Sequence, residues 1–390
     1  MAESSAADTV HHIMSVDKSQ KQKTPQEWKK WKEEKKARKR KWKEQKLLNL
    51  MEKEKNKERK KEEAEEVRLK QEAEEQKIYD RLGRKYTVSI ALPGSIMDNA
   101  QSPELRTYLA GQIARAAVVF KVDEIIIFDE TGSTATTTEG QFGGIGKKGQ
   151  ANVQMARILQ YLECPQYLRK SFFPQHKDLQ YAGLLNPLDC YHHLRIDDVS
   201  TYREGVVLNK PIREGRGSFA NVGLFKEVQI DRQLKPGVRV TVKLAPQDED
   251  RKHIKGTVVS PSSPRTEAGL YWGYSVRLAS SLGAVFTECP YKQGYDVTIG
   301  TSERGADIDN FTIDKFAHAL VVFGGVHGLE ASLDADEGLN VDDPSFLFQH
   351  YLNTCPDQGS RTIRTEEAVL ITMSSLRPKF VEADNRMKAS

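Results

Sequence analysis

The sequence has few cysteines and none of the short motifs that pair them. Its 390 residues contain four cysteines and no Cys-x-x-Cys pair; they are Cys164, Cys190, Cys289 and Cys355. This scatter argues against a disulfide framework and a Cys-rich zinc module, and it fits reduced thiols in cytoplasm or nucleus. The Gly-x-Ser-x-Gly motif of many hydrolases is also absent. We therefore expect neither a redox enzyme of the Cys-x-x-Cys type nor a hydrolase built on that motif.

Long apolar runs are missing as well. The longest runs, such as Ile125 to Phe128 and Ala319 to Phe323, fall far short of the roughly 18 residues that indicate a membrane span. The first 30 residues lack the apolar stretch of a signal peptide. The sequence therefore predicts a soluble, non-secreted protein with no membrane partner.

The formal net charge of +4 is unevenly distributed. The first 86 residues contain 26 basic and 18 acidic side chains, which leaves 33 basic and 37 acidic for the remainder. Residues 1–85 therefore form a basic arm, rich in helix-favouring Lys and Glu but without apolar heptads. Its cluster from Lys35 to Lys41 fits three interpretations: a solvated, mostly disordered helix-prone tail, a nuclear or nucleolar address, or a patch that contacts RNA phosphates.

Beyond the arm, the pattern is typical of an α/β sheet. A β-rich run at Val88–Leu92 precedes a helix that starts at Pro103, and a continuous apolar strand follows at Glu124–Phe128. A long Thr- and Gly-rich loop is expected after this strand. The further expected elements are a helix at 151–163, strands at 274–278, 296–300 and 319–323, and a closing helix at 366–376.

Between residues 195 and 270 the pattern changes to short strands separated by turn residues. Five such strands in about 75 residues favour a small barrel of the oligonucleotide-binding (OB) kind. They are expected at 204–208, 220–224, 228–230, 238–244 and 256–259. The barrel would be inserted into an α/β domain made of residues 86–194 and 271–378, with a C-terminal tail at 379–390.

Three motifs that suggest ligands do not satisfy the geometry that they need. Gly144 to Gly149 matches the dinucleotide pattern Gly-x-Gly-x-x-Gly, but no strand ends at its first glycine. The acidic run Asp334 to Asp343 lacks the Gly and Glu of a calcium loop. His192 and His193 have no acid or Cys at ligand spacing, so no metal site is predicted.

Three loops next to predicted strands are more informative. Thr301–Gly305 follows the strand ending at Gly300, and Gly324-Gly325 follows the strand ending at Phe323. The third, Asn353–Gly359, precedes a short run at Ser360–Arg364. In open α/β sheets the ligand crevice is formed by loops at the carboxyl ends of strands, where glycine allows the backbone to approach a ligand. The loops together predict one small-ligand site.

These loops resemble the SPOUT class of S-adenosylmethionine-dependent RNA methyltransferases. The segment from Thr354 to Ala368 is similar to the last cofactor motif of that class, and Ala319–Gly325 to the preceding strand and glycine loop. Leu109–Ala117 and Val122–Ile126 resemble the first helix and strand of its archaeal and eukaryotic branch. The resemblance covers most of residues 86–378.

The resemblance implies a trefoil-knotted α/β domain, a homodimer, S-adenosyl-L-methionine as cofactor, and an inserted barrel that helps to hold RNA. The resemblance also implies that the substrate is a pyrimidine base of large-subunit (28S) ribosomal RNA, with uridine N3 as the favoured atom. Carried onto this chain, the cofactor-binding residues would be Arg304, Gly324, Asn353, Thr354, Gln358, Gly359, Ile363 and Thr365.

The chemistry also suggests roles for three charged residues in or beside these loops. Methylation at uridine N3 requires loss of a proton or stabilisation of the resulting anion. We expect Arg304 to stabilise that anion, Glu303 to act as the base, and Arg364 to hold a phosphate or the acceptor base. Arg364 stands where the ribose-methylating branch carries Asn, which favours a base as the target.

A second hypothesis is a non-catalytic RNA-binding or mitotic scaffold at the spindle, centromere or kinetochore. The resemblance and the arm imply a nuclear or nucleolar location, with spindle, kinetochore or centrosome as further sites in mitosis. Because the body is slightly acidic, RNA would be bound by local patches. The candidates are Arg213, Arg216 and Lys226 in the barrel, with Lys147 and Lys148 in the Gly-rich loop.

Overall fold

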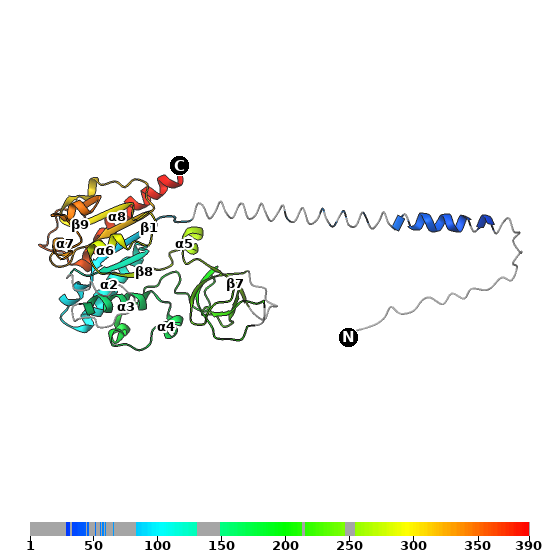
Figure 1. The fold of residues 1–390 in the computed structure, drawn as a ribbon, viewed down its shortest axis with the longest axis horizontal. Coiled ribbons are helices and arrows are strands. Elements are labelled where there is room, and N and C mark those ends of the chain that lie inside the picture. Colours follow the sequence, from blue (N-terminus) through cyan, green and yellow to red (C-terminus); the bar gives the residue numbers. More distant parts are fainter. Residues whose placement is uncertain are drawn as a thin grey trace, which may run out of the picture. The chain divides into compact units, whose positions relative to one another are not determined.

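The chain, described by a computed structural model, divides into two units, Met1–Glu75 and Gln76–Ser390 (Figure 1). The residues that it describes are 29–31, 33–43, 45–46, 51, 55, 57, 59, 65, 83–130, 149–212, 215–245 and 254–389. In the first unit, residues 33–43 are helical with exposed side chains, as their composition predicts. In the second unit, the first strand is Thr87–Pro93, one residue longer at each end than the expected run Val88–Leu92.

The centre of the second unit is a six-stranded sheet in the order β11-β9-β10-β1-β2-β8 (Figure 1). Every neighbouring pair in it is parallel. The strands are β1 (Thr87–Pro93), β2 (Glu124–Phe128), β8 (Ser275–Ala279), β9 (Val297–Asp307), β10 (His318–Val322) and β11 (His350–Asn353). The α/β class predicted from unbroken apolar strands is thus confirmed. The knotted path implied by the resemblance stays a prediction.

The helix α2 (Pro103–Val119) begins where its capping residue predicts. Ser102 accepts a hydrogen bond from the amide of Leu105 (3.3 Å), and Pro103 occupies the first turn of α2. The other helices are α3 (Gln150–Glu163), α4 (Gln166–Phe172), α5 (Ser263–Ala268), α6 (Leu282–Thr287), α7 (Glu330–Asp334) and α8 (Thr365–Ala389). Short 3-10 turns are η1 (Gly94–Asn99), η3 (Lys177–Leu179), η4 (Ala182–Leu184), η5 (Ile308–Asn310) and η6 (Pro344–Leu347).

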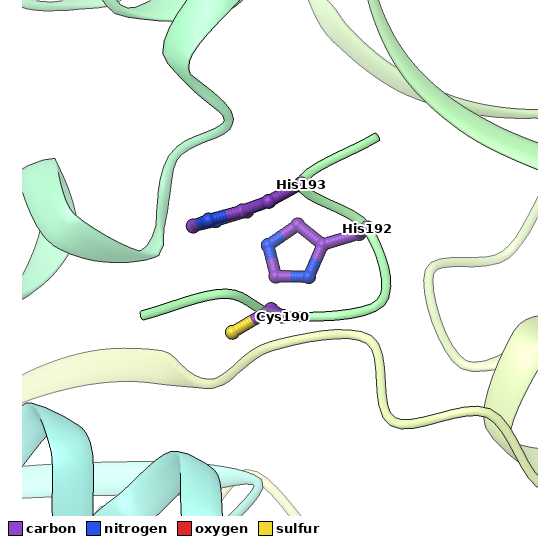
Figure 2. Close-up of side chains that lie close together, drawn as sticks. All are labelled: Cys190, His192 and His193. Atoms are coloured by element: carbon purple, nitrogen blue, oxygen red, sulfur yellow. The ribbon is translucent and has the colours of Figure 1, made fainter. Parts of the chain in front are cut away.

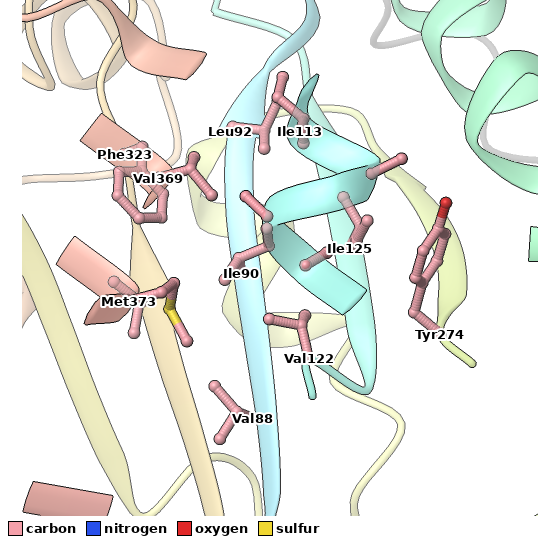
Figure 3. Packing of buried hydrophobic residues seen from close by; sticks show 14 of the residues in the cluster. Val88, Ile90, Leu92, Ile113, Val122, Ile125, Tyr274, Phe323, Val369 and Met373 are labelled. Atoms are coloured by element: carbon pink, nitrogen blue, oxygen red, sulfur yellow. The ribbon is translucent and has the colours of Figure 1, made fainter. Parts of the chain in front are cut away.

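Apolar side chains cover both faces of the sheet. On one face, Ile90 and Ile125 pack with Ile113 of α2 and Met373 of α8 (Figure 3). On the other, Ile126 belongs to a cluster that also contains residues of α6. Full burial of an aliphatic side chain contributes about 1.5–3 kcal/mol, so these clusters fix the positions of the strand ends.

Five strands close into a barrel in the order β3-β4-β5-β7-β6. They are β3 (Tyr202–Val207), β4 (Phe219–Asn221), β5 (Val228–Ile230), β6 (Arg239–Leu244) and β7 (Ile254–Val259). Alternating side chains such as Val228, Ile230 and Val242 fill its interior. The inserted five-stranded barrel is therefore confirmed.

Three expectations about the C-terminal half are wrong. The strand expected to end at Gly300 continues as β9 to Asp307, and the run Ser360–Arg364 forms no strand. The third strand of this region is instead β11, which comes before the loop. The tail expected at 379–390 is the end of α8 up to Ala389, because Phe380 is buried in the core and offsets the proline at position 378.

Among the described helices, none combines the length and the apolar character needed to cross a membrane. The loop expected after β2 lies mostly outside the described residues, as do Gly144 to Lys148 of the Gly-rich motif.

Candidate active site at the carboxyl ends of the strands

The carboxyl ends of β9, β10 and β11 lie at one edge of the sheet. Gly300 of β9 is in register with Val322 of β10 on one side and with Tyr351 of β11 on the other. The part of β9 that follows Gly300 and the loops that follow β10 and β11 are therefore neighbours, although long stretches of sequence separate them. This arrangement is the ligand crevice of an open α/β sheet.

The pairing of β9 with β11 is interrupted at the predicted first loop. Tyr351 pairs with Gly300, but the next residue, Leu352, pairs with Ala306. Thr301–Gly305 therefore bulges from the ladder, even though its backbone is extended. The bulge exposes Arg304, whose side chain is 75 % accessible and whose guanidinium lies 3.3 Å from a carboxylate oxygen of Glu330. Glu303 is also exposed.

Hydrogen bonds join the three loops to one another. The side-chain amide of Asn353 donates to the backbone carbonyl of Glu303 (3.2 Å), and the hydroxyl of Thr365 donates to the carbonyl of Gly324 (3.0 Å). The hydroxyls of Thr354 and Thr372 lie 2.7 Å apart and tie the end of β11 to α8. Asn353, Thr354, Thr365 and Gly324 are thus brought together as predicted, and each also has a role in holding the loops.

The last loop contributes the remaining predicted residues. Gln358 donates a hydrogen bond to the carbonyl of Ser360 (2.9 Å), and Ile363 is half-buried. The backbone amide of Arg364 donates to the Glu367 carboxylate (3.0 Å), while the Arg364 side chain is exposed. This contact resembles a helix capping interaction, which explains why the run before α8 is not a strand.

Glycine is required by the packing of the loop at position 324 but not at position 359. A Cβ on Gly324 would lie 2.6 Å from the carbonyl carbon of Gly328, so the loop itself requires glycine there. A Cβ on Gly359 would meet no atom of the described residues within 4 Å, so packing among these residues does not require glycine at this position. Space beside Gly359 is therefore open to a ligand.

The residues present fit S-adenosylmethionine, the cofactor that the resemblance implies. This cofactor offers an adenine edge, ribose hydroxyls, an ammonium group and a carboxylate. Backbone groups around Gly324 and Gly359 suit the adenine edge, and the exposed guanidinium of Arg304 suits the carboxylate. These assignments to individual residues stay predictions.

A carboxylate that the sequence analysis missed lies on the neighbouring strands. Glu130, two residues after the end of β2, accepts a hydrogen bond at Oε1 from the hydroxyl of Ser95, which follows β1. Its second oxygen, Oε2, is buried and has no hydrogen-bond partner in the part of the chain that the structure describes. The sequence signal that could have identified Glu130 is its position just after a strand end. It was overlooked because Glu130 belongs to the long Thr- and Gly-rich stretch that was interpreted as a loop.

The interpretation of His192 and His193 as lacking a nearby acid or Cys is wrong. Cys190 lies beside both rings, with potential ligand atoms within 4.8 Å of one another (Figure 2). The Nε2 atoms of the two rings lie 2.8 Å and 2.6 Å from the backbone carbonyl of Glu163. Burial raises the pKa of Cys190 to about 12, so its sulfur is protonated at neutral pH. The rings therefore cap the last residue of α3.

A buried ionic network joins the barrel to the α/β domain. The guanidinium of Arg239 on β6 contacts both carboxylate oxygens of Glu163 (2.7 and 2.9 Å) and one of Glu204 (2.7 Å). The indole of Trp272 donates to the other oxygen of Glu204 (2.6 Å). Burial alone would raise the pKa of Glu163, but hydrogen bonds from His192 and Arg239 lower it to about 2. The network fixes the barrel beside α3.

The predicted RNA contacts are only partly described. Arg216 and Lys226 lie on the barrel with exposed side chains. Arg213, Lys147 and Lys148 lie outside the described residues. Two of the predicted side chains are therefore exposed on the barrel, and the rest of the patch stays a prediction.

Comparison with known proteins gives strong matches that include most of the second unit. A family model described as "Putative RNA methyltransferase" matches residues 87–376. The 28S rRNA (uridine-N(3))-methyltransferase of Homo sapiens is 65% identical over 305 residues, covering 78% of this chain and 81% of the human protein. The proteins with the same description from Mus musculus and Drosophila melanogaster are 63% identical over 305 residues and 51% identical over 362 residues. They cover 78% and 90% of this chain, and 79% and 73% of their own lengths.

Proposed function

Because the chain belongs to this SPOUT-type family of RNA methyltransferases, we propose that it methylates N3 of a uridine in 28S ribosomal RNA. The observation that carries the proposal is the edge where the β9 bulge meets the loops after β10 and β11, within the segment that the family model matches. The cofactor is S-adenosyl-L-methionine, whose sulfonium makes its methyl group electrophilic.

The protein's contribution is chiefly positioning. The linked loops hold the methyl donor, and the acceptor base must approach it in line while water is kept out. A base inside a helix cannot be reached at N3, so the target is a splayed or single-stranded uridine. We propose that Arg304 contacts the cofactor carboxylate or the developing negative charge on the base, and that Arg364 holds a phosphate or the acceptor base.

The finer assignments are also proposals. We infer a homodimer that acts in the nucleus or nucleolus, with the basic arm as the address. The exposed apolar side chains Leu105 and Tyr108 on α2 and Leu370 on α8 are candidate contacts between copies. Light scattering of wild type and Leu105→Glu checks the dimer, because an interface at α2 requires the variant to shift toward the monomer.

Mass spectrometry of ribosomal RNA nucleosides from cells that carry Arg304→Ala or Thr354→Arg tests the activity. We expect 3-methyluridine in 28S RNA to fall in both variants and to be restored by the wild-type chain. An unchanged mark, with both variants expressed and folded, would contradict the proposed site.

The alternative of a spindle, centromere or kinetochore scaffold makes a different prediction. A scaffold that does not use the cofactor would support normal mitosis with Thr354→Arg, which places a long side chain in the loop region. If the same variant removes the RNA mark but leaves mitosis intact, the two roles are separate.

A further inference from the structure

Glu130 and Ser95 form a pair at the carboxyl ends of β1 and β2, next to the loop that follows β10. In the sheet, β1 lies between β10 and β2. Ser95 lies in η1 directly after β1, and Glu130 lies two residues after β2. The pair therefore adjoins the crevice described above and belongs to none of its three loops.

The two oxygens of the Glu130 carboxylate have different surroundings. Oε1 accepts the hydrogen bond from the Ser95 hydroxyl, which fixes the orientation of the group. Oε2 is buried and has no partner in the described part of the chain. A buried carboxylate oxygen without a hydrogen-bond donor is unfavourable, so such an atom is expected where function requires it.

The unpartnered oxygen Oε2 faces the loop that follows β10, which contains Gly324 and Gly325. A Cβ built on Gly325 would lie 2.5 Å from Oε2 and 3.1 Å from Oε1 of Glu130. Any side chain at position 325 would therefore displace the carboxylate. The neighbouring residue, Gly324, is held through its carbonyl by Thr365 (3.0 Å). The carboxylate thus touches a loop whose geometry is fixed on its other side.

We propose that Glu130 is the general base that removes the N3 proton of the target uridine, with Ser95 as its positioning residue. Oε2 accepts the N3 proton, and the nitrogen lone pair forms the new N–C bond to the methyl carbon. The C–S bond breaks with its electron pair going to sulfur, which gives 3-methyluridine and S-adenosylhomocysteine. The proton on Glu130 then leaves to water. The inference rests on the proposed function.

Glu130 suits this role better than Glu303, the base expected from the sequence. Glu303 is exposed on the β9 bulge, where water hydrates its carboxylate. Glu130 is oriented by Ser95 and presents one desolvated acceptor oxygen. An acceptor of this kind also selects uridine, because N3 of uridine carries a proton whereas N3 of cytidine is itself an acceptor.

The test uses the full-length protein and an RNA oligonucleotide that contains the target uridine, in single-turnover reactions. Glu130→Gln keeps the shape of the side chain and removes the base, so the rate should fall by about 10²–10⁴-fold. Glu130→Asp should recover part of it. Glu337→Gln, an exposed glutamate outside the three loops and the Glu130–Ser95 pair, is the matched control and should react at the wild-type rate.

Two readouts separate a base from a structural residue. The rate of Glu130→Gln should rise with pH up to the most alkaline conditions tolerated, because N3 must then ionise in water. RNA with 5-fluorouridine, whose N3 proton is more acidic, should restore part of the lost rate. Calorimetry should show S-adenosylhomocysteine binding within about twofold of wild type, since Glu130 is not a proposed cofactor ligand.

The outcomes distinguish the inference from the proposed function. A wild-type protein that leaves uridine N3 unmethylated overturns the proposed function. If the wild type is active and Glu130→Gln reacts within threefold of the wild-type rate, the assignment of Glu130 as the base is wrong, while the proposed function stands. If Glu130→Gln does not fold, Ser95→Ala decides. The inference requires that this variant lose about tenfold in rate and regain part with 5-fluorouridine, and a wild-type rate overturns it.

Discussion

The hydroxyl of Thr365, the first residue of α8, donates a 3.0 Å hydrogen bond to the backbone carbonyl of Gly324, 41 residues earlier in the chain. The contact ties the start of the last helix to the loop after β10. It also satisfies a carbonyl that lies beyond the end of its strand. The start of α8 therefore sets the backbone geometry of the central cofactor loop.

Thr365→Val should weaken cofactor binding with little effect on folding. The change keeps the side-chain shape and removes one hydrogen bond, worth about 1 kcal/mol, or roughly fivefold in Kd. Calorimetry with S-adenosylhomocysteine measures the change. Thr365→Ser keeps the hydroxyl and should bind as wild type does, and Thr312→Val, at an exposed position, is a neutral control. If Thr365→Val binds S-adenosylhomocysteine as tightly as the wild type does, the hydrogen bond from Thr365 to Gly324 does not contribute to cofactor binding.

Arg304→Ala should reduce cofactor binding much more than stability. The Arg304–Glu330 ion pair is largely exposed, and such pairs contribute little, so Tm should change by no more than about 2 °C. Loss of a charge-assisted hydrogen bond to the cofactor carboxylate should weaken binding by roughly 10–100-fold. Glu330→Gln removes the same ion pair but keeps Arg304. If Arg304→Ala and Glu330→Gln weaken cofactor binding to the same extent, the loss is due to the broken ion pair and not to a contact between Arg304 and the cofactor.

The sequence predicted the sheet and the barrel well because their strands are short apolar runs bounded by turn residues. Strand β2 was predicted at its observed bounds, and β5 likewise. Strand β11 was missed because its four residues, His350–Asn353, include only two apolar side chains, and its place in the sheet depends on pairing with β9. Pairing between distant segments has no local signal.

The candidate site shows the same limit. The loops with Gly324 and Asn353 were found because their residue types suit a ligand at a strand end. Glu130 was missed because its significance lies in contacts with Ser95 and with the Gly325 loop, which only the fold brings together. Likewise, the sequence spacing of His192 gave no sign of its contact with Glu163.

Glu163→Gln should destabilise the protein in a pH-dependent way. The folded-state pKa of Glu163 is about 2 against an ordinary value of 4.5, so its ionised form stabilises the fold above pH 4.5. This contribution, up to about 3 kcal/mol, should disappear as the pH falls from about 4.5 toward 2. Urea unfolding of both proteins at several pH values measures it. A constant stability difference across this range would contradict the assigned ionisation.

His193 should give a separate stability change at higher pH. Burial and the neighbouring His192 lower the pKa of His193 from 6.5 to about 4. Since the unfolded chain takes up the proton first, this residue's contribution is complete above pH 6.5 and is lost as the pH falls toward 4. His193→Gln cannot take up that proton. The wild type should therefore lose more stability than the variant between pH 7 and 4, and parallel curves would show that His193 does not titrate as described.

Deleting residues 1–80 should change localisation far more than cofactor binding. The arm supplies the basic surplus of the chain, and residues 1–75 belong to a different unit from the one that contains the strand-end site. We therefore expect S-adenosylhomocysteine to bind the truncated protein within about twofold of the full chain, while a fluorescent fusion loses its nuclear accumulation. Loss of cofactor binding on truncation would refute this division.

Two six-residue substitutions then identify what the arm does. Changing the six basic residues between Lys35 and Lys41 to Gln removes the densest cluster, and changing the six between Lys53 and Lys61 is a control of equal charge in the same arm. A nuclear address requires that only the first set abolish nuclear accumulation. Direct RNA contact would instead lower the salt dependence of RNA binding, because each lost phosphate contact reduces the slope of log K against log salt by about 0.7–0.9. If both sets of substitutions reduce the salt slope of RNA binding equally and neither changes nuclear accumulation, the arm binds RNA through its overall positive charge. It is then not a nuclear address.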